Sequence, residues 1–385
     1  GYKSSGDDQG RRDDIQTIRN NYIMTKKKPT SKDVAQLAGV SQPTVSMILN
    51  NYDNVRFSPE TVQRVMDACT KLNYRVPSKR KGNSGERYEK LIMAMCPSYT
   101  NLYYISLLEA MCNQAEERGY SLTVFSSGRN MKLEGQFANL ACQQDALGAL
   151  LLYKPANSVA LQQLIANMPV VAICDKTEVS NMDIIELDSE KLGMIIAEHL
   201  LSLGHRKIAY ISTELNERHP ARLYRLKGMQ NAYARAGVSP FNILTCTMDS
   251  EKIAYTKDIT SYETGYCLGK RVVEKYDDIT ALVGMNDMVA IGIMDALADK
   301  KYKVPQDYSV CGCDNTMISQ YRTISMTSVE HFDANRGREA VDVLIRKIEQ
   351  ENGTDGDLWP ASAVRVEFVP KLVARASTGP NRRKK

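Results

Sequence analysis

Residues 30–46 read TSKDVAQLAGVSQPTVS, and with the stretch that follows they predict three short helices. Helices are expected to begin near residues 31, 42 and 59. At these points Thr30, Ser41 and Ser58 place a side-chain oxygen where the first backbone N–H groups of a helix need an acceptor. Gly39 lies between the first two helices and can adopt the left-handed conformation of a sharp reversal. The first two helices therefore predict a helix-turn-helix.

Apolar residues recur at helical spacing in all three helices and predict a common core. These are Val34, Leu37, Ala38, Val40, Val45, Ile48, Leu49, Val62, Val65, Met66, Cys69 and Leu72. The second helix keeps short polar side chains near its start, where a helix N-terminus favours phosphate. We expect DNA contacts from Thr30, Ser31, Ser41, Gln42, Pro43, Thr44, Ser46, Met47, Asn50 and Arg56. On helix pattern alone, a three-helix bundle that binds no DNA remains an alternative.

Positive charge is concentrated at this end of the chain. Residues 24–90 contain 13 Lys and Arg against 6 Asp and Glu, whereas the whole chain of 385 residues has a net charge of +5. Such a patch is what neutralisation of DNA phosphates requires. Glycine and proline in residues 76–90 disfavour a helix and predict a basic linker or hinge. Lys79, Arg80 and Lys81 of this linker are expected to contact phosphates.

Short β-rich apolar runs alternate with amphipathic stretches over residues 91–377. The runs at 91–95, 122–125, 149–153, 170–173, 208–211, 281–284 and 309–313 predict buried parallel strands. The stretches at 104–118, 189–203, 221–236, 262–276 and 286–299 predict helices. Alternating strands and helices predict doubly wound α/β lobes. In such sheets, ligands bind beyond the carboxyl ends of the strands.

Polar residues fall at that expected position. Asp175, Asn286 and Asp314 each follow a predicted strand, and Arg225 opens a predicted helix after another strand. Carboxylates and amides can bind sugar hydroxyls, and arginine offers a planar fork of donors. Each residue alone is equally explained as a helix N-cap or a surface ion pair. Their joint position favours a site for a hydroxyl-rich ligand.

Several short motifs occur in a fixed order along the chain. In the N-terminal part they are Lys32-Asp33-Val34-Ala35, Gly39-Val40-Ser41, Thr44-Val45-Ser46, Leu49-Asn50 and Ser58-Pro59-Glu60-Thr61. Further along they are Leu203-Gly204-His205-Arg206-Lys207, Arg225-Leu226-Lys227-Gly228, Asn286-Asp287-Met288-Val289-Ala290, Val304-Pro305-Gln306-Asp307 and Cys313-Asp314-Asn315. Over residues 30–377 the chain resembles the lactose repressor family of bacterial transcription regulators. The resemblance implies a helix-turn-helix headpiece at 30–75 and a two-lobed, periplasmic-binding-protein-like core for effector binding and dimerisation at 91–377.

The resemblance also implies which residues contact the effector. At the matching positions stand Tyr103, Tyr104, Asp175, Arg225, Thr260, Asn286 and Asp314. The two tyrosines are equally explained as packing residues. Several relatives have an aromatic residue at the position of Thr260, so a sugar is expected rather than a planar purine. Asn83 replaces the leucine with which many relatives wedge into the minor groove, so kinking of the operator is not expected.

The sequence contains no recognisable set of catalytic residues, metal ligands or cofactor-binding residues. The nine cysteines lie mostly in apolar segments and are expected to be small core residues, without zinc spacing. The four histidines show no HExxH spacing, and His205, in a helix-to-strand turn, is expected to be structural. No signal sequence or long apolar run is present, so a cytoplasmic location without membrane contact is expected.

Both ends of the chain fall outside the family pattern. Residues 1–29 are expected to be disordered or a non-native extension, with Met24 as the natural start, and residues 378–385 a basic tail. The remainder predicts a DNA-binding transcriptional regulator without enzymatic activity. We expect a homodimeric repressor of carbohydrate-utilisation genes that binds double-stranded operator DNA and responds to a sugar or sugar derivative. The alternative is a sugar-binding protein or sugar-processing enzyme on the same cleft, and the headpiece favours the first.

Overall fold

The computed structural model describes residues 30–49, 57–72, 90–175, 182–216, 219–248, 259–352 and 363–382. The chain divides into an N-terminal unit, residues 1–86, and a C-terminal unit, residues 87–385. The predicted residues Asn50, Arg56, Lys79, Arg80 and Lys81 lie outside the described residues, as does the extension at 1–29.

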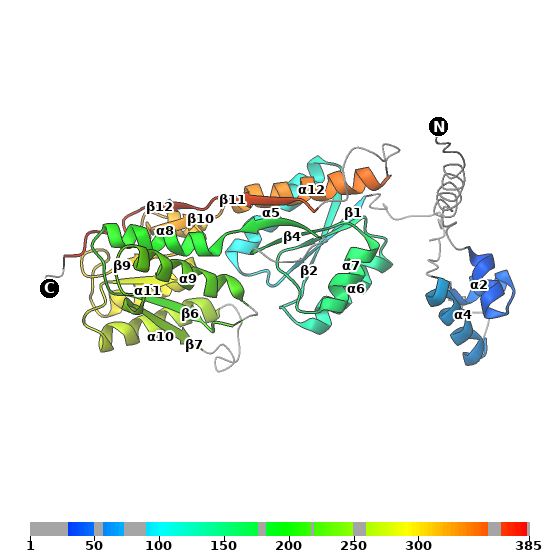
Figure 1. The fold of residues 1–385 in the computed structure, drawn as a ribbon, viewed down its shortest axis with the longest axis horizontal. Coiled ribbons are helices and arrows are strands. Elements are labelled where there is room, and N and C mark those ends of the chain that lie inside the picture. Colours follow the sequence, from blue (N-terminus) through cyan, green and yellow to red (C-terminus); the bar gives the residue numbers. More distant parts are fainter. Residues whose placement is uncertain are drawn as a thin grey trace, which may run out of the picture. The chain divides into compact units, whose positions relative to one another are not determined.

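Three helices form the described part of the N-terminal unit: α2 (Ser31–Ala38), α3 (Gln42–Leu49) and α4 (Pro59–Leu72) (Figure 1). Each helix begins at the residue that follows its predicted capping residue. The Thr30 N–H donates to the Asp33 carboxylate at 2.7 Å. The hydroxyls of Ser41 and Ser58 accept from the N–H three residues later at 3.2 and 3.3 Å. Gly39 ends α2 in the left-handed conformation, at φ +66°, so the predicted helix-turn-helix is present.

The core of this unit is small. Val34, Val45 and Val65 are fully buried at its centre. Leu37 was expected in this core, but its side chain is 51% exposed, so that prediction is wrong. Helix α2 has only about two turns, and its buried stripe runs through Val34, Ala35 and Ala38, which leaves Leu37 on the flank.

The C-terminal unit begins with an all-parallel six-stranded sheet in the order β11-β5-β4-β3-β1-β2. Its strands are β1 (Leu91–Cys96), β2 (Ser121–Ser126), β3 (Gly148–Leu151), β4 (Val170–Asp175), β5 (Asp183–Leu187) and β11 (Arg365–Phe368). Helices α5 (Leu102–Glu117) and α12 (Asp333–Asn352) pack on one face, and α6 (Met131–Gln143) and α7 (Ser158–Asn167) on the other. We call this assembly lobe 1. Asp175 pairs with Leu187 at the carboxyl ends of β4 and β5, the edge where a site was predicted.

Lobe 2 is built on a second parallel sheet, in the order β7-β6-β8-β9. Its strands are β6 (Ile208–Thr213), β7 (Ile243–Met248), β8 (Ala281–Gly284) and β9 (Ser309–Cys311). Its helices are α8 (Ser189–Ser202), α9 (Pro220–Arg235), α10 (Ile259–Lys275) and α11 (Asp287–Asp299), with short 3-10 turns η1 (Pro240–Asn242) and η2 (Met317–Gln320). An antiparallel pair, β10 (Ser328–Glu330) and β12 (Lys371–Val373), completes the lobe. The sequence predicted five of the core helices and seven of the strands, and all of them are present.

Helices α8 and α9 pack with their backbones in contact. A Cβ atom placed on Gly193 would lie 1.9 Å from the carbonyl oxygen of Arg225, and one on Gly228 would lie 1.8 Å from that of Glu190. Only glycine fits at these two positions. The close approach fixes the backbone of Arg225, a predicted effector contact, against α8.

Over its described residues, the C-terminal unit crosses between the lobes three times. The crossings are the steps from β5 to α8 at Asp188, from β10 to α12 after Glu330, and from β11 to β12 after Phe368. Each is only a few residues long. Polar residues that end the strands of both lobes therefore meet near these crossings.

The C-terminal segment and two cysteines differ from expectation. Residues 378–381 were expected to belong to a basic tail, but Gly379 hydrogen-bonds to Ser309, and Asn381 to the Leu203 carbonyl, both in lobe 2. Cys112 and Cys267 are exposed rather than core residues, because they lie on the outer faces of their helices. Among the described residues, no helix combines the length and apolar character needed to cross a membrane.

Candidate functional site

The exposed face of α3 carries the residues predicted to read DNA. Gln42, Pro43 and Met47 are exposed, while Val45 and Ile48 of the same helix point into the core. The Gln42 amide donates to the Ser31 hydroxyl at 2.9 Å. This contact positions one polar side chain on the outer surface of α3, as a recognition helix requires.

The hydroxyls at the start of α3 are held in a fixed arrangement. The Ser41 and Thr44 hydroxyl oxygens are 2.8 Å apart, and Ser41 also accepts from the Thr44 N–H. Thr30 is exposed, and Ser31 and Ser46 are partly buried. All described members of the predicted DNA-binding set thus lie on α2, α3 or their caps. Their contact with DNA stays a prediction.

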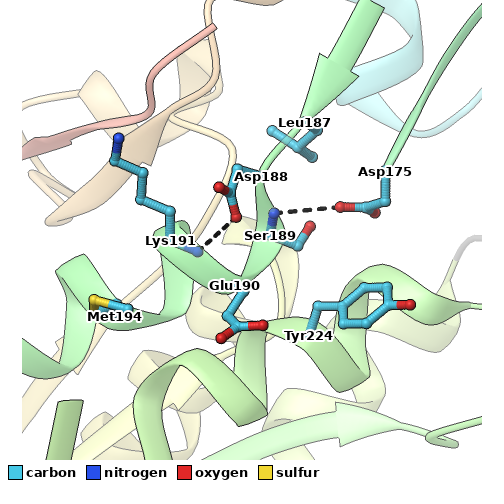
Figure 2. Close-up of a pocket in the computed structure, with 8 residues that line it drawn as sticks. All are labelled: Asp175, Leu187, Asp188, Ser189, Glu190, Lys191, Met194 and Tyr224. Carbon is cyan, nitrogen blue, oxygen red and sulfur yellow. Dashed lines mark hydrogen bonds between the residues drawn. The ribbon is translucent and has the colours of Figure 1, made fainter. Parts of the chain in front are cut away.

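In the C-terminal unit, Asp175 stands at the carboxyl end of β4 and accepts from the Ser189 N–H at 3.3 Å. The first turn of α8 therefore faces a carboxylate, which its exposed N–H groups favour. A cavity of about 520 Å³ opens here, within the range of small-molecule sites. Figure 2 shows its lining residues, Asp175, Leu187, Asp188, Ser189, Glu190, Lys191, Met194 and Tyr224.

Arg225, Asp314 and His331 form a buried cluster in lobe 2. The Arg225 guanidinium donates to the Met285 carbonyl and lies 3.9 Å from Asp314 Oδ1. His331 Nε2 also lies 3.9 Å from the same oxygen. Asp314 is held at φ +118°, a conformation costly for a residue with a side chain and common at functional sites. Of the cavity-lining residues, only Asp175 was predicted, and Arg225 and Asp314 are not among the residues that line it.

The two predicted tyrosines belong to lobe 1. Tyr103 and Tyr104 pack edge to face with ring centres 4.9 Å apart, and both contact the core beneath α5. The Tyr103 hydroxyl accepts from Arg336 at 2.9 Å, and the Tyr104 hydroxyl from Arg129 at 3.3 Å. The packing alternative therefore holds for their rings, and their hydroxyls belong to the polar network. Direct contact with an effector stays a prediction.

Two further predicted effector contacts, Asn286 and Thr260, are not placed in a ligand site by the structure. The Asn286 side-chain oxygen accepts from the Val289 N–H at 2.9 Å and caps α11. The capping alternative is thus realised for this oxygen, and a ligand contact through the amide nitrogen stays a prediction. Thr260 falls in α10, but its side chain lies outside the described part of the chain.

Burial controls the protonation of the carboxyl groups in this region. It raises the pKa of Asp175 and of Asp314, while the hydrogen bond from Ser189 to the first and the positive charge of Arg225 beside both act in the opposite direction. Burial raises the pKa of Asp333 to about 7, so this group is about half protonated at neutral pH. Burial lowers the pKa of His331, which is therefore neutral. The carboxyl and imidazole groups of this region can thus both donate and accept hydrogen bonds.

One group of described residues has metal-ligand atoms close together. Cys313, Asp314 and His331 are buried, with ligand atoms within 4.8 Å of one another. The sequence spacing could not show this group, because His331 follows a different strand. Arg225 contacts the same aspartate, and its fixed positive charge opposes a cation there. The arrangement favours a hydrogen-bonded network over a metal site.

Sequence reasoning missed three polar residues near the second crossing: His331, Asp333 and Arg336. Arg336 is 0% exposed. It lies in the first turn of α12, where the helix dipole favours an anion and disfavours a cation. The sequence feature that could have identified Arg336 is a positive charge in the first turn of an amphipathic helix.

Comparison with known proteins agrees with this architecture. Residues 30–77 match the bacterial regulatory proteins of the lacI family, and residues 197–378 match a periplasmic binding protein-like domain. The chain is similar to the HTH-type transcriptional repressor PurR of Mannheimia succiniciproducens, with 30% identity over 353 residues, 90% of this chain and 98% of that protein. It is also similar to the HTH-type transcriptional regulator DegA of Bacillus subtilis, with 27% identity over 360 residues, 92% of this chain and 99% of that protein.

Solved structures share the fold. A complex of the transcriptional regulator CelR with cellobiose aligns with a TM-score of 0.62 at 23% identity, covering 91% of this chain and 99% of that one. A lacI family regulator from Enterococcus faecium with bound ribose aligns with a TM-score of 0.64 at 17% identity, covering 76% and 99%. The sequence relatives are named as transcriptional repressors and regulators rather than enzymes. With its helix-turn-helix headpiece, its two-lobed core and these relatives, the chain belongs to the lacI family of bacterial regulatory proteins.

Proposed function

We propose that the chain is a cytoplasmic, ligand-responsive repressor of carbohydrate-utilisation genes. Its headpiece binds operator DNA as part of a homodimer, and a sugar or sugar derivative binds where the two lobes meet. One observation carries the proposal. A helix-turn-helix with an exposed polar face on α3 shares its chain with a core in which Asp175 of lobe 1 lies near Arg225 and Asp314 of lobe 2. We call these three residues the interlobe cluster, and in it Arg225 Nε is buried without a hydrogen-bond partner.

On the DNA side, the exposed side chains of α3 define what can be read. The Gln42 amide suits an adenine edge, and Met47 suits a thymine methyl group. Pro43 offers no side-chain hydrogen bond. A homodimer would place two such helices on half-sites about one helical turn apart, so a pseudo-palindromic operator is expected.

On the effector side, the candidate contacts come from separate elements. Asp175 follows a strand of lobe 1, whereas Arg225 and Asp314 belong to lobe 2. A ligand that bridges them would favour one arrangement of the lobes and change the spacing of the headpieces across the dimer. A coupling of about 1 to 3 kcal/mol is enough for a 5- to 150-fold change in operator affinity.

The first experiment selects bound sequences from a random DNA pool with the purified full chain. Candidate sugars are then titrated against the enriched site. A two-fold symmetric site that one sugar weakens would support the proposal. If no sequence is enriched, with and without the sugars, the DNA-binding half of the proposal is refuted.

A paired substitution tests the effector site. Arg225→Ala should abolish the response to the sugar and spare operator binding, because Arg225 belongs to the interlobe cluster and not to the headpiece. Arg235→Ala, an exposed arginine on the same helix, is the matched control. Loss of operator binding in a folded Arg225→Ala dimer would contradict the site assignment.

A further inference from the structure

Arg336 is an unusual residue for the inside of a protein. Its guanidinium is fully buried and stays charged, because arginine does not lose its proton in proteins. Nη1 donates to the Tyr103 hydroxyl at 2.9 Å. The nearest carboxylate oxygen, Asp333 Oδ1, lies 4.0 Å from Nη1, beyond hydrogen-bond length. Nε and Nη2 have no hydrogen-bond partner.

The unpartnered atoms around Arg336 are mostly donors. Besides Arg336 Nε and Nη2 they include Arg225 Nε, against the acceptor-only atom Asp333 Oδ1 and the ring nitrogen His331 Nδ1. Buried donors left without acceptors are costly, and native proteins rarely keep several in one place. The group that satisfies them must therefore bring acceptor oxygens.

The charges nearby indicate how much negative charge that group carries. Arg225 and Arg336 both act on Asp175, lowering its pKa against the effect of burial. Asp314 and Asp333 lie close by, and Asp287 and Glu330 act on them in turn, so the carboxyl groups outnumber the two guanidinium groups. A doubly charged phosphate would be repelled by these carboxylates, whereas a singly charged, planar carboxylate matches the fork of an arginine.

We propose that the effector is a sugar acid, whose carboxylate binds the Nε and Nη2 edge of Arg336 while its hydroxyls bind Asp175 and the lobe 2 cluster. This inference rests on the proposed function and narrows its effector from sugars in general to hydroxy carboxylates. The donor atoms are sealed from solvent, so the lobes must separate to admit the ligand and close again around it.

The test compares matched ligands on the full chain by calorimetric titration. The panel pairs D-glucuronate with D-glucose, D-galacturonate with D-galactose, and D-gluconate with D-glucose, and it adds glucose 6-phosphate. At least one sugar acid should bind about 10- to 150-fold more tightly than its neutral parent, as expected for a hydrogen bond to a charged group. A panel in which no sugar acid is preferred overturns the inference. Preference for the phosphate also overturns it.

Substitution of Arg336 separates a ligand contact from a structural residue. Arg336→Met keeps the length of the side chain but removes a positive charge that stabilises the buried carboxylates of Asp175 and Asp333, so the unliganded protein should unfold at a lower temperature while remaining folded. The preference for the sugar acid should disappear. Arg338→Met, exposed on the same helix, is the control. Arg336→Lys, which keeps the charge and loses the fork, should retain only part of the preference.

The outcomes distinguish this inference from the proposed function. A neutral sugar that changes operator affinity, with no preference for acids, refutes the sugar acid and keeps the repressor. If Arg336→Met lowers the unfolding temperature and leaves ligand preference unchanged, Arg336 is structural and the inference fails. If neither acids nor neutral sugars alter operator affinity, the effector half of the proposed function fails as well.

Discussion

Replacing Gly193 with alanine tests whether contact between α8 and α9 holds the effector site in place. The added Cβ would lie 1.9 Å from the carbonyl oxygen of Arg225. Carbon and oxygen atoms in favourable contact are about 3.3 Å or more apart, so the two backbones must separate by about 1.4 Å. Because the obstacle is the backbone of Arg225 itself, no side-chain rotation relieves the clash.

The expected magnitude follows from two opposing effects. Alanine favours a helix over glycine by about 0.5 to 1 kcal/mol. Overpacking costs about 1 to 3 kcal/mol, and more where backbone must move. We therefore expect Gly193→Ala to lower the free energy of unfolding by about 2 kcal/mol. Effector affinity should also fall, because the displaced helix carries Arg225.

Gly135→Ala is the matched control, since Gly135 also lies inside a helix, α6. A Cβ there would lie 3.4 Å from the Asn157 side-chain nitrogen, an ordinary contact. This variant should be more stable than wild type by about 0.4 to 1 kcal/mol. Urea unfolding of the full chain, followed by circular dichroism, measures both variants. If Gly193→Ala proved as stable as Gly135→Ala, the close contact between α8 and α9 would be refuted.

Three other outcomes are expected. The folded protein holds the Asp333 proton up to about pH 7 and the unfolded chain only up to about pH 3.9. Lowering the pH from 8 to 6 should therefore stabilise wild type by about 1.4 kcal/mol relative to Asp333→Asn. If the difference in free energy of unfolding between the two proteins stayed constant over this pH range, the raised pKa of Asp333 would be contradicted. Asn286→Ala should cost about 1 kcal/mol through loss of its cap and should also weaken ligand binding through loss of the amide nitrogen, and calorimetry showing unchanged binding would make Asn286 a helix cap alone. Operator affinity should fall about 10³- to 10⁵-fold between 50 and 200 mM salt if six to ten phosphates are neutralised, and a flat dependence in filter binding would exclude a phosphate-dominated interface.

Local chemistry explains why so much of the fold could be predicted. The caps at Thr30, Ser41 and Ser58 act within three residues, so their effect can be read directly from the sequence. Buried parallel strands can likewise be recognised in the sequence as apolar runs, because both of their faces are buried. Leu37 was misplaced because a two-turn helix gives too short a pattern to fix which side faces the core.

The site could be predicted only in part, for a reason of distance along the chain. Asp175 and Asp314 follow strands, and that rule of position applies to any doubly wound sheet. Arg336 meets Tyr103 from a helix at the opposite end of the core sequence, after the last crossing of the main chain into lobe 1. No sequence pattern in either segment predicts the hydrogen bond between Arg336 and Tyr103. For Asn286 the position in the sequence was predicted, but not its role, because a residue that follows a strand can serve either as a helix cap or as a ligand contact.

The short crossings between the lobes have a mechanical consequence. Asp175, Arg225 and Asp314 lie beside these crossings, so a ligand bound by them, as proposed, would act close to the axis of any rotation between the lobes. Strand β1 begins at Leu91 on the edge of lobe 1 away from that axis, and its six residues span about 20 Å. A rotation of about 10° would carry the start of β1 through roughly 3.5 Å over that length. A small rotation at the crossings would therefore give a larger displacement at the start of β1, the end of lobe 1 that is distant from the proposed ligand.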